Sequence, residues 1–295
     1  MILIGLITKL AILAVLIMIL CSLRKKNRQQ AGDDESAQDE MSIDSIDGSD
    51  FRIRGYESLV DLHTHTVASG HAYSSLMEMI VSAKDKGLRI LGITEHGPAI
   101  PGACDLLYFK NMWVVPRQYG DLRVMLGAEL NILDTKGTID LDEKWCSYLD
   151  IRLAGIHSLC WDGGTPEENT AGVVAAMHNP WVQVITHPAD GTAELLFEPL
   201  VLASKETGTL LEINNNSLRP GRGKVKAIDN NRELLMLCKK HNVPVIIGSD
   251  AHINFDVSNH GLAYDLAEEV GFPEELILNK NPEALLAALK PTPSK

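Results

Sequence analysis

The chain has 295 residues, enough for one large domain or two ordinary ones, and its overall composition is that of a globular protein. Its formal net charge of −12 argues against a general affinity for nucleic acid, which normally requires a basic surface. The five cysteines are widely spaced and odd in number, which indicates free thiols in a reducing compartment and argues against a disulfide framework.

The N-terminal segment differs from the rest of the chain. Residues 1–23 are almost wholly apolar, and they are long enough to span a bilayer if Lys9 lies near the interface. The basic cluster at 24–28 favours a cytoplasmic location for the remainder of the protein. We therefore expect one N-terminal apolar helix that anchors the protein to the cytoplasmic face of the membrane, with a signal peptide or a misassigned start codon as alternatives. Residues 24–55 are acidic and polar, and they predict a disordered linker.

From residue 56 to about 290, short apolar runs alternate with helix-length segments. Segments 76–86, 196–207 and 232–241 carry apolar residues at helical spacing, as an outer layer of helices requires. This alternation predicts an α/β fold with a parallel sheet, for which a barrel is the simplest closure. The seven runs are 59–62, 90–94, 124–126, 151–154, 182–186, 209–213 and 245–247.

Nearly every apolar run ends in a side chain that can bind a metal ion. In an α/β barrel the C-terminal ends of all strands meet at one face, so these side chains would converge there. Seven of the ten histidines lie at a run's end or in the loop beyond it. His178, His241 and His260 do not follow this pattern and are left out. The nine candidates are His63, His65, His71, His96, Glu129, His157, His187, Asp250 and His252.

Nine ligands are too many for one tetrahedral ion, so we expect two or three ions that share carboxylates. Glu129 and Asp250 are the candidates for bridging ligands. Mixed imidazole and carboxylate ligands suit zinc, manganese or iron.

Five motifs built on these residues resemble the PHP family, the polymerase and histidinol phosphatase group of metal-dependent phosphoesterases. They are D-L-H-T-H at 61–65, I-T-E-H-G-P at 93–98, G-A-E at 127–129, I-T-H-P at 185–188 and G-S-D-A-H at 248–252. V-A-S-G-H-A-Y-S at 67–74 and E-I-N-N at 212–215 resemble the YcdX-type phosphatases within it. One departure is Glu95, which stands where the family commonly has Asp.

The resemblance implies a distorted seven-stranded (β/α)7 TIM-like barrel with three divalent ions at its C-terminal face. Zinc is the first expectation, with manganese or iron as alternatives. In the implied arrangement the ions are held by His63, His65, Glu129 and Asp250; by Glu129, His157 and His187; and by His71, His96 and His252.

These observations predict a phosphatase that hydrolyses a small phosphomonoester by a metal-activated hydroxide, with Glu129, His157 and Asp250 acting through metal-bound water. Four side chains on predicted loops are candidates for binding the substrate phosphate: Arg117, Asn215, Ser217 and Arg219. The alternatives are a 3′-to-5′ nuclease and a membrane-tethered protein that binds metal without turnover. The sequence predicts no oligomeric state.

Overall fold

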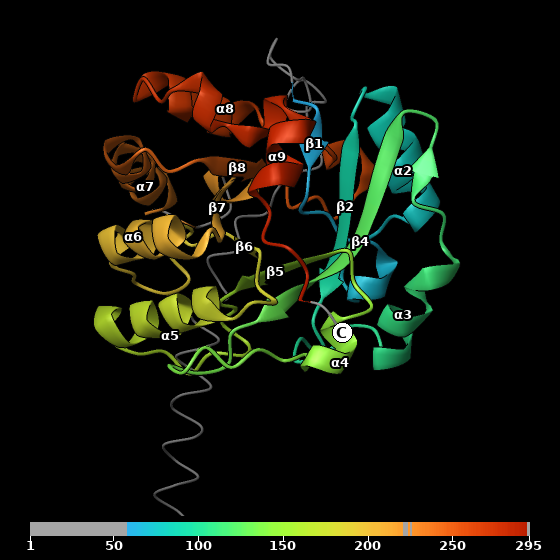
Figure 1. Ribbon diagram of the computed structural model, residues 1–295, viewed down its shortest axis with the longest axis horizontal. Coiled ribbons are helices and arrows are strands. Elements are labelled where there is room, and N and C mark those ends of the chain that lie inside the picture. Colours follow the sequence, from blue (N-terminus) through green and yellow to red (C-terminus); the bar gives the residue numbers. More distant parts are fainter. Residues whose placement is uncertain (1–57, 221–223, 225, 294–295) are drawn as a thin grey trace, which may run out of the picture. The chain divides into compact units, whose positions relative to one another are not determined.

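The computed structural model describes residues 58–220, 224 and 226–293. Seven parallel strands follow one another around a nearly closed barrel, in the order β1-β2-β4-β5-β6-β7-β8 (Figure 1). The predicted α/β barrel is therefore confirmed, and each predicted apolar run overlaps one of these strands. They are β1 (Val60–Asp61), β2 (Ile90–His96), β4 (Leu122–Asn131), β5 (Ile151–Gly155), β6 (Val184–Ile185), β7 (Leu210–Asn214) and β8 (Val245–Gly248).

One further short strand, β3 (Gln118–Tyr119), pairs antiparallel with the start of β4 and has no apolar run to predict it. The α-helices lie outside the strands, and α5 to α8 are stacked along one side of the molecule (Figure 1). The helices are α2 (Leu76–Asp85), α3 (Leu106–Asn111), α4 (Glu143–Cys146), α5 (Pro166–His178), α6 (Phe197–Thr207), α7 (Ala227–His241), α8 (Gly261–Glu269) and α9 (Pro282–Ala288). The 3-10 turns are η3 (Val67–Ser69), η4 (Met112–Val114), η5 (Asn216–Leu218), η6 (Asn254–Asp256), η7 (Glu274–Leu276) and η8 (Leu278–Lys280).

Side-chain caps define where α2 and α5 begin. Helix α2 starts with a capping box in which Ser75 and Glu78 bond each other's backbone N–H groups. Thr165 and Glu168 form the same motif at the start of α5, where proline occupies the first turn. The chain thus enters each of these two helices at a defined residue.

Asn279, in η8, completes the barrel wall between β1 and β8. Its buried side-chain amide donates to the carbonyl oxygens of Val60 (2.9 Å) and Ile247 (2.7 Å), and its oxygen accepts from the Ile247 N–H (2.7 Å). Further along, His65 N–H donates to Ala251 O at 2.8 Å. The first and last strands are therefore joined through a side chain and an isolated bridge at Thr64, which accounts for the distorted closure.

The inner face of the barrel changes from apolar to polar along the strands. In β4, Met125 belongs to a small apolar cluster, and Glu129 lies on the same face four residues later. Ile246 and Asp250 are related in the same way in and beyond β8. A larger apolar cluster packs the helices against the outer face of the strands. The polar side chains of this inner face therefore gather at its C-terminal end.

No helix within the described residues is long and apolar enough to cross a membrane. The predicted anchor at 1–23 and the predicted linker at 24–55 lie outside the described residues, so both remain predictions.

Candidate metal centre

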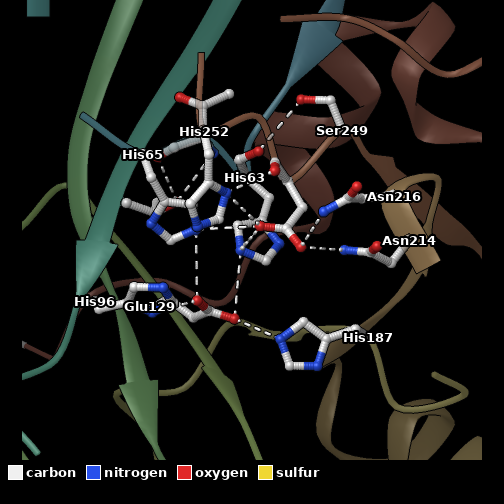
Figure 2. A network of polar contacts seen from close by, with 12 residues as sticks. His63, His65, His96, Glu129, His187, Asn214, Asn216, Ser249 and His252 are labelled. Carbon is white, nitrogen blue, oxygen red and sulfur yellow. Dashed lines mark hydrogen bonds and ion pairs between the residues drawn. The ribbon is translucent and has the colours of Figure 1, made fainter. Parts of the chain in front are cut away.

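The nine predicted ligands converge at the C-terminal ends of the strands. His63 and His65 follow β1, His71 follows η3, His96 ends β2, and Glu129 lies near the end of β4. The other four follow later strands, namely His157 after β5, His187 after β6, and Asp250 and His252 after β8. Figure 2 shows side chains from strands far apart in sequence gathered around the carboxylate of Glu129, among them His63, His65, His96, His187 and His252.

Glu129 is the centre of this cluster, and its side chain is fully buried. Five histidine rings surround its two oxygens. Oε1 lies 2.8 Å from His187 Nε2, 3.3 Å from His63 Nε2 and 3.3 Å from His157 Nε2, and Oε2 lies 2.9 Å from His96 Nδ1 and 3.5 Å from His65 Nε2. One carboxylate therefore connects four strands, as a shared ligand would.

Asp250 faces the same histidine pair from the other side. Its Oδ1 lies 3.4 Å from His65 Nε2 and 3.6 Å from His63 Nε2. Its backbone has a φ of 52°, in the left-handed region that an aspartate occupies only at a local cost. Asn214 and Asn216 donate to its Oδ2 at 3.4 and 3.3 Å. The two asparagine contacts and the backbone conformation together direct the Asp250 carboxylate at His63 and His65.

His71 lies on the exposed side of the cluster. Its ring stacks on His96 at a centroid distance of 4.8 Å and lies 4.9 Å from the ring of His252. The Nε2 atoms of His71 and His96 are 3.2 Å apart. His63 and His65, whose centroids are 5.0 Å apart, lie deeper. The cluster therefore extends from the barrel interior to the surface.

The donor atoms fit divalent metal ions. Buried polar atoms almost always make a hydrogen bond. Several atoms in this cluster make none, because their short contacts with neighbouring rings and carboxylates are not aligned as hydrogen bonds: His63 Nε2, His65 Nε2, His96 Nδ1, His157 Nε2 and Glu129 Oε2. Three groups of ligand atoms lie within 4.8 Å of one another: His63, His65 and Asp250; His65, His96 and His252; and His96, Glu129 and His157. Each group contains members of a ligand set that the resemblance implies, although His65 and His96 each occur in two groups.

Electrostatics in the metal-free protein keep the two carboxylates ionised. Burial opposes the charge of Glu129, but the rings of His63 and His157 hold the pKa of Glu129 well below its usual value. Burial also lowers the pKa of His63, and the carboxylates of Glu212, Glu129 and Asp250 outweigh it and raise the pKa of His63 well above its usual value. A proton on His63 therefore supplies part of the positive charge that bound cations would otherwise provide to these carboxylates.

Glu212, in β7, is a site residue that the sequence analysis did not single out. It is buried, and its Oε1 lies 2.8 Å from His63 Nδ1, so the His63 Nε2 atom is turned toward Glu129. Its Oε2 accepts from the His187 N–H (2.7 Å) and from Asn214 (3.1 Å). The sequence contained a signal for this role, because Glu212 and Asn214 are two residues apart in a strand and therefore lie on the same, inner face.

Of the four predicted phosphate contacts, Arg117 is not in the site. It precedes β3 and β4 and is therefore at the opposite end of the barrel, where it donates to Asp150 at 2.6 Å and to two backbone carbonyls. Loops that precede strands do not reach the C-terminal face.

The other three predicted contacts follow β7, on the correct side, but have structural partners. Asn215 accepts from the Ala263 N–H at 3.0 Å, and Ser217 donates to Asn214 Oδ1 at 2.9 Å. Arg219 pairs with Asp256 at 2.8 Å. The contacts with Asp250 are made instead by Asn214 and Asn216, the neighbours of Asn215.

Comparisons with known proteins identify a family and several similar sequences. The PHP domain family matches residues 61–215. A probable phosphatase of Clostridium novyi is 41% identical over 232 residues, which cover 79% of this chain and 94% of that protein. A probable phosphatase of Caldicellulosiruptor bescii is 42% identical over 231 residues, with coverages of 78% and 95%.

A solved structure shares the fold. It is that of the histidinol phosphate phosphatase HisK from Lactococcus lactis subsp. lactis Il1403, complexed with zinc, L-histidinol and phosphate. The TM-score is 0.51 at 17% identity, and the match covers 73% of this chain and 95% of that one. From the matched family region and the two relatives above 40% identity, the chain belongs to the PHP domain family.

Proposed function

We propose that this protein is a metal-dependent phosphatase that hydrolyses a small phosphomonoester. The observation that carries the proposal is the set of buried nitrogen and oxygen atoms without hydrogen-bond partners, which face shared points around Glu129 and Asp250. The proposal is supported by the relatives, which are named probable phosphatases, and by a structural neighbour solved with zinc and phosphate.

Nine residues would hold three divalent ions, with zinc as the first candidate and manganese or iron as alternatives. When bound, such ions polarise a phosphoryl group, offset its charge and lower the pKa of water toward neutrality. The sets are those implied by the resemblance: His63, His65, Glu129 and Asp250; Glu129, His157 and His187; and His71, His96 and His252.

The candidate ligands differ in their exposure to solvent, and this difference indicates the side from which a substrate would enter. Glu129 is fully buried and orients the histidine rings around it, whereas His71 is exposed and Asp250 is 16% exposed. A substrate would therefore approach from the side of His71 and His252 and place its phosphoryl group toward Asp250. The apolar floor of the barrel below Glu129 excludes water from the other side of the cluster.

Two other functions are open for the same site. A 3′-to-5′ nuclease would use the same ligands, but the net charge of −12 does not favour a nucleic-acid substrate. A protein that binds metal without turnover would also retain the ligands. We place the phosphatase domain at residues 56–290, preceded by the proposed anchor at 1–23 and linker at 24–55.

The test is elemental analysis of the purified protein, together with phosphate release from p-nitrophenyl phosphate and a panel of phosphomonoesters in added zinc or manganese. Glu129→Ala and His157→Ala should each lose metal and activity. His178→Ala is the matched control, because this histidine is exposed at the end of α5. A metal-saturated protein that hydrolyses no phosphomonoester would refute the phosphatase, and faster cleavage of single-stranded DNA would favour the nuclease.

A further inference from the structure

The hydroxyl of Ser69 connects two predicted metal ligands to a buried carboxylate. Ser69 is the last residue of η3 and is fully buried. Its Oγ lies 3.0 Å from His65 Nδ1, accepts from the His96 N–H at 3.1 Å, and donates to Glu95 Oε2 at 2.5 Å. A single oxygen atom therefore contacts a side chain from the loop after β1 and the backbone at the end of β2.

Glu95 determines the direction of these hydrogen bonds. Its Oε2 also accepts from the Thr66 N–H (3.1 Å), and its Oε1 accepts from the hydroxyls of Thr66 (2.5 Å) and Tyr108 (3.2 Å). An ionised carboxylate can only accept hydrogen bonds. The Ser69 hydrogen must therefore point at Glu95, and the Ser69 oxygen is left to accept.

The orientation of Ser69 determines the tautomer of His65. Since the Ser69 oxygen can only accept, the proton of a neutral His65 ring lies on Nδ1 and points at Ser69. The lone pair of His65 is then on Nε2, 3.5 Å from Glu129 Oε2 and 3.4 Å from Asp250 Oδ1. This is the ring nitrogen that has no hydrogen-bond partner.

The turn that carries Ser69 is itself fixed. Thr66 caps η3 by accepting from the Ala68 N–H, while its own hydroxyl donates to Glu95. Gly70 ends the turn at a φ of 87°, where a Cβ atom would lie 2.3 Å from Gly102 O. The turn cannot shift without breaking these contacts, and the position of Ser69 is correspondingly defined.

We propose that Ser69, oriented by Glu95, is a positioning residue that holds His65 in the tautomer needed to bind metal through Nε2. This inference rests on the proposed function only in taking His65 as a ligand. The outer contact of a ligating histidine typically contributes about 10- to 100-fold to metal affinity. Here that contact is a neutral hydroxyl backed by a carboxylate, whereas His63 contacts the Glu212 carboxylate directly.

The experiment uses the full chain loaded with zinc. Long-range ¹H–¹⁵N correlation of the histidine rings, with His65 assigned by its absence in His65→Gln, reports which ring nitrogen carries the proton. We expect Nδ1 protonation and zinc on Nε2 in the wild type. Ser69→Ala should lower zinc affinity by about 10- to 100-fold in a chelator competition and, before zinc is added, move part of the His65 proton from Nδ1 to Nε2.

Ser74→Ala is the matched control, because Ser74 is also a buried serine between β1 and α2, and among the described residues its hydroxyl bonds only Asn254. It should retain zinc affinity and the His65 signal, even if it unfolds at a lower temperature. Equal losses of zinc affinity in the two variants would overturn the proposal, because Ser69 would then be merely structural. So would zinc on Nδ1 of His65 in the wild type, a result that needs no variant to fold. None of these readouts requires hydrolysis, so they stand apart from a failure of the phosphatase assay.

Discussion

Replacing Glu212 by Gln tests whether the carboxylates behind the histidines are needed for metal binding. The Oε2 atom accepts from the His187 N–H, which can only donate, so the amide oxygen of Gln must stay on that side. The amide nitrogen then faces His63 Nδ1, where the native Oε1 atom lies at 2.8 Å. Two donors would oppose each other unless His63 gives up its Nδ1 proton.

The neutral His63 ring avoids that clash only by moving its proton to Nε2, the nitrogen that faces Glu129 at 3.3 Å and Asp250 at 3.6 Å. A protonated Nε2 cannot bind metal. Loss of an outer contact of this kind costs about 10- to 100-fold in metal affinity, which corresponds to about 1.4 to 2.7 kcal/mol. We expect a loss at the upper end of that range, because the substitution also removes a buried negative charge beside the site.

The assay is competition between Glu212→Gln and a chromophoric zinc chelator, accompanied by kcat/KM for phosphomonoester hydrolysis at saturating zinc. Glu233→Gln is the control, since Glu233 is exposed on α7 and the exchange is chemically identical. Zinc affinity of Glu212→Gln within about twofold of the wild type would refute the tautomer argument. So would an equal loss in Glu233→Gln.

Three further predictions concern neighbouring features. Gly248→Ala should lower zinc affinity at least about tenfold in the same competition, because a Cβ atom there would lie 1.8 Å from Glu212 Oε1 and 3.1 Å from His63 Cβ. Unchanged zinc affinity would mean that Glu212 and His63 move aside without losing their positions at the site. Asn279→Ala should lower the free energy of unfolding by about 2 to 4 kcal/mol in urea titrations, because it leaves buried groups of Val60 and Ile247 unpaired; a loss below about 1 kcal/mol would show that water or a shifted backbone replaces the amide. Zinc affinity should rise with pH between about 6 and 8, because the raised pKa of His63 keeps a proton there that zinc must displace; a pH-independent affinity would contradict this.

The strand-end pattern was sufficient to predict the fold and the convergence of the nine candidate ligands, because a parallel barrel brings all C-terminal strand ends to one face. It was insufficient for Arg117, since a loop that precedes a strand and one that follows it look alike in composition, and only the pairing of β3 with β4 reveals the difference. Ser217 shows another limit. A serine that binds phosphate and one that bonds a nearby side chain, as this one does with Asn214, have the same sequence signal.

Glu212 and Ser69 were missed as site residues for a different reason. Alternation along a strand could place Glu212 on an inner face, but the ring nitrogens that Glu212 and Ser69 contact follow only from the three-dimensional arrangement. Glu95 was noticed through its departure from the family's usual Asp, and the contacts that its carboxylate makes with Thr66 and Tyr108 give that observation a physical content.

His63 contacts the carboxylate of Glu212 and His65 contacts the hydroxyl of Ser69, and this difference affects the order in which the two rings bind metal. His63 lies beside the carboxylates of Glu212, Glu129 and Asp250. Their attraction for a proton outweighs the effect of burial, so the pKa of His63 is raised. Burial and the neighbouring rings of His96 and His252 instead hold the pKa of His65 well below its usual value. His65 is thus neutral and, through Ser69, already presents a lone pair, whereas His63 must first lose a proton. The ion that His63 and His65 would share should therefore first bind His65, and proton release should accompany its subsequent binding to His63.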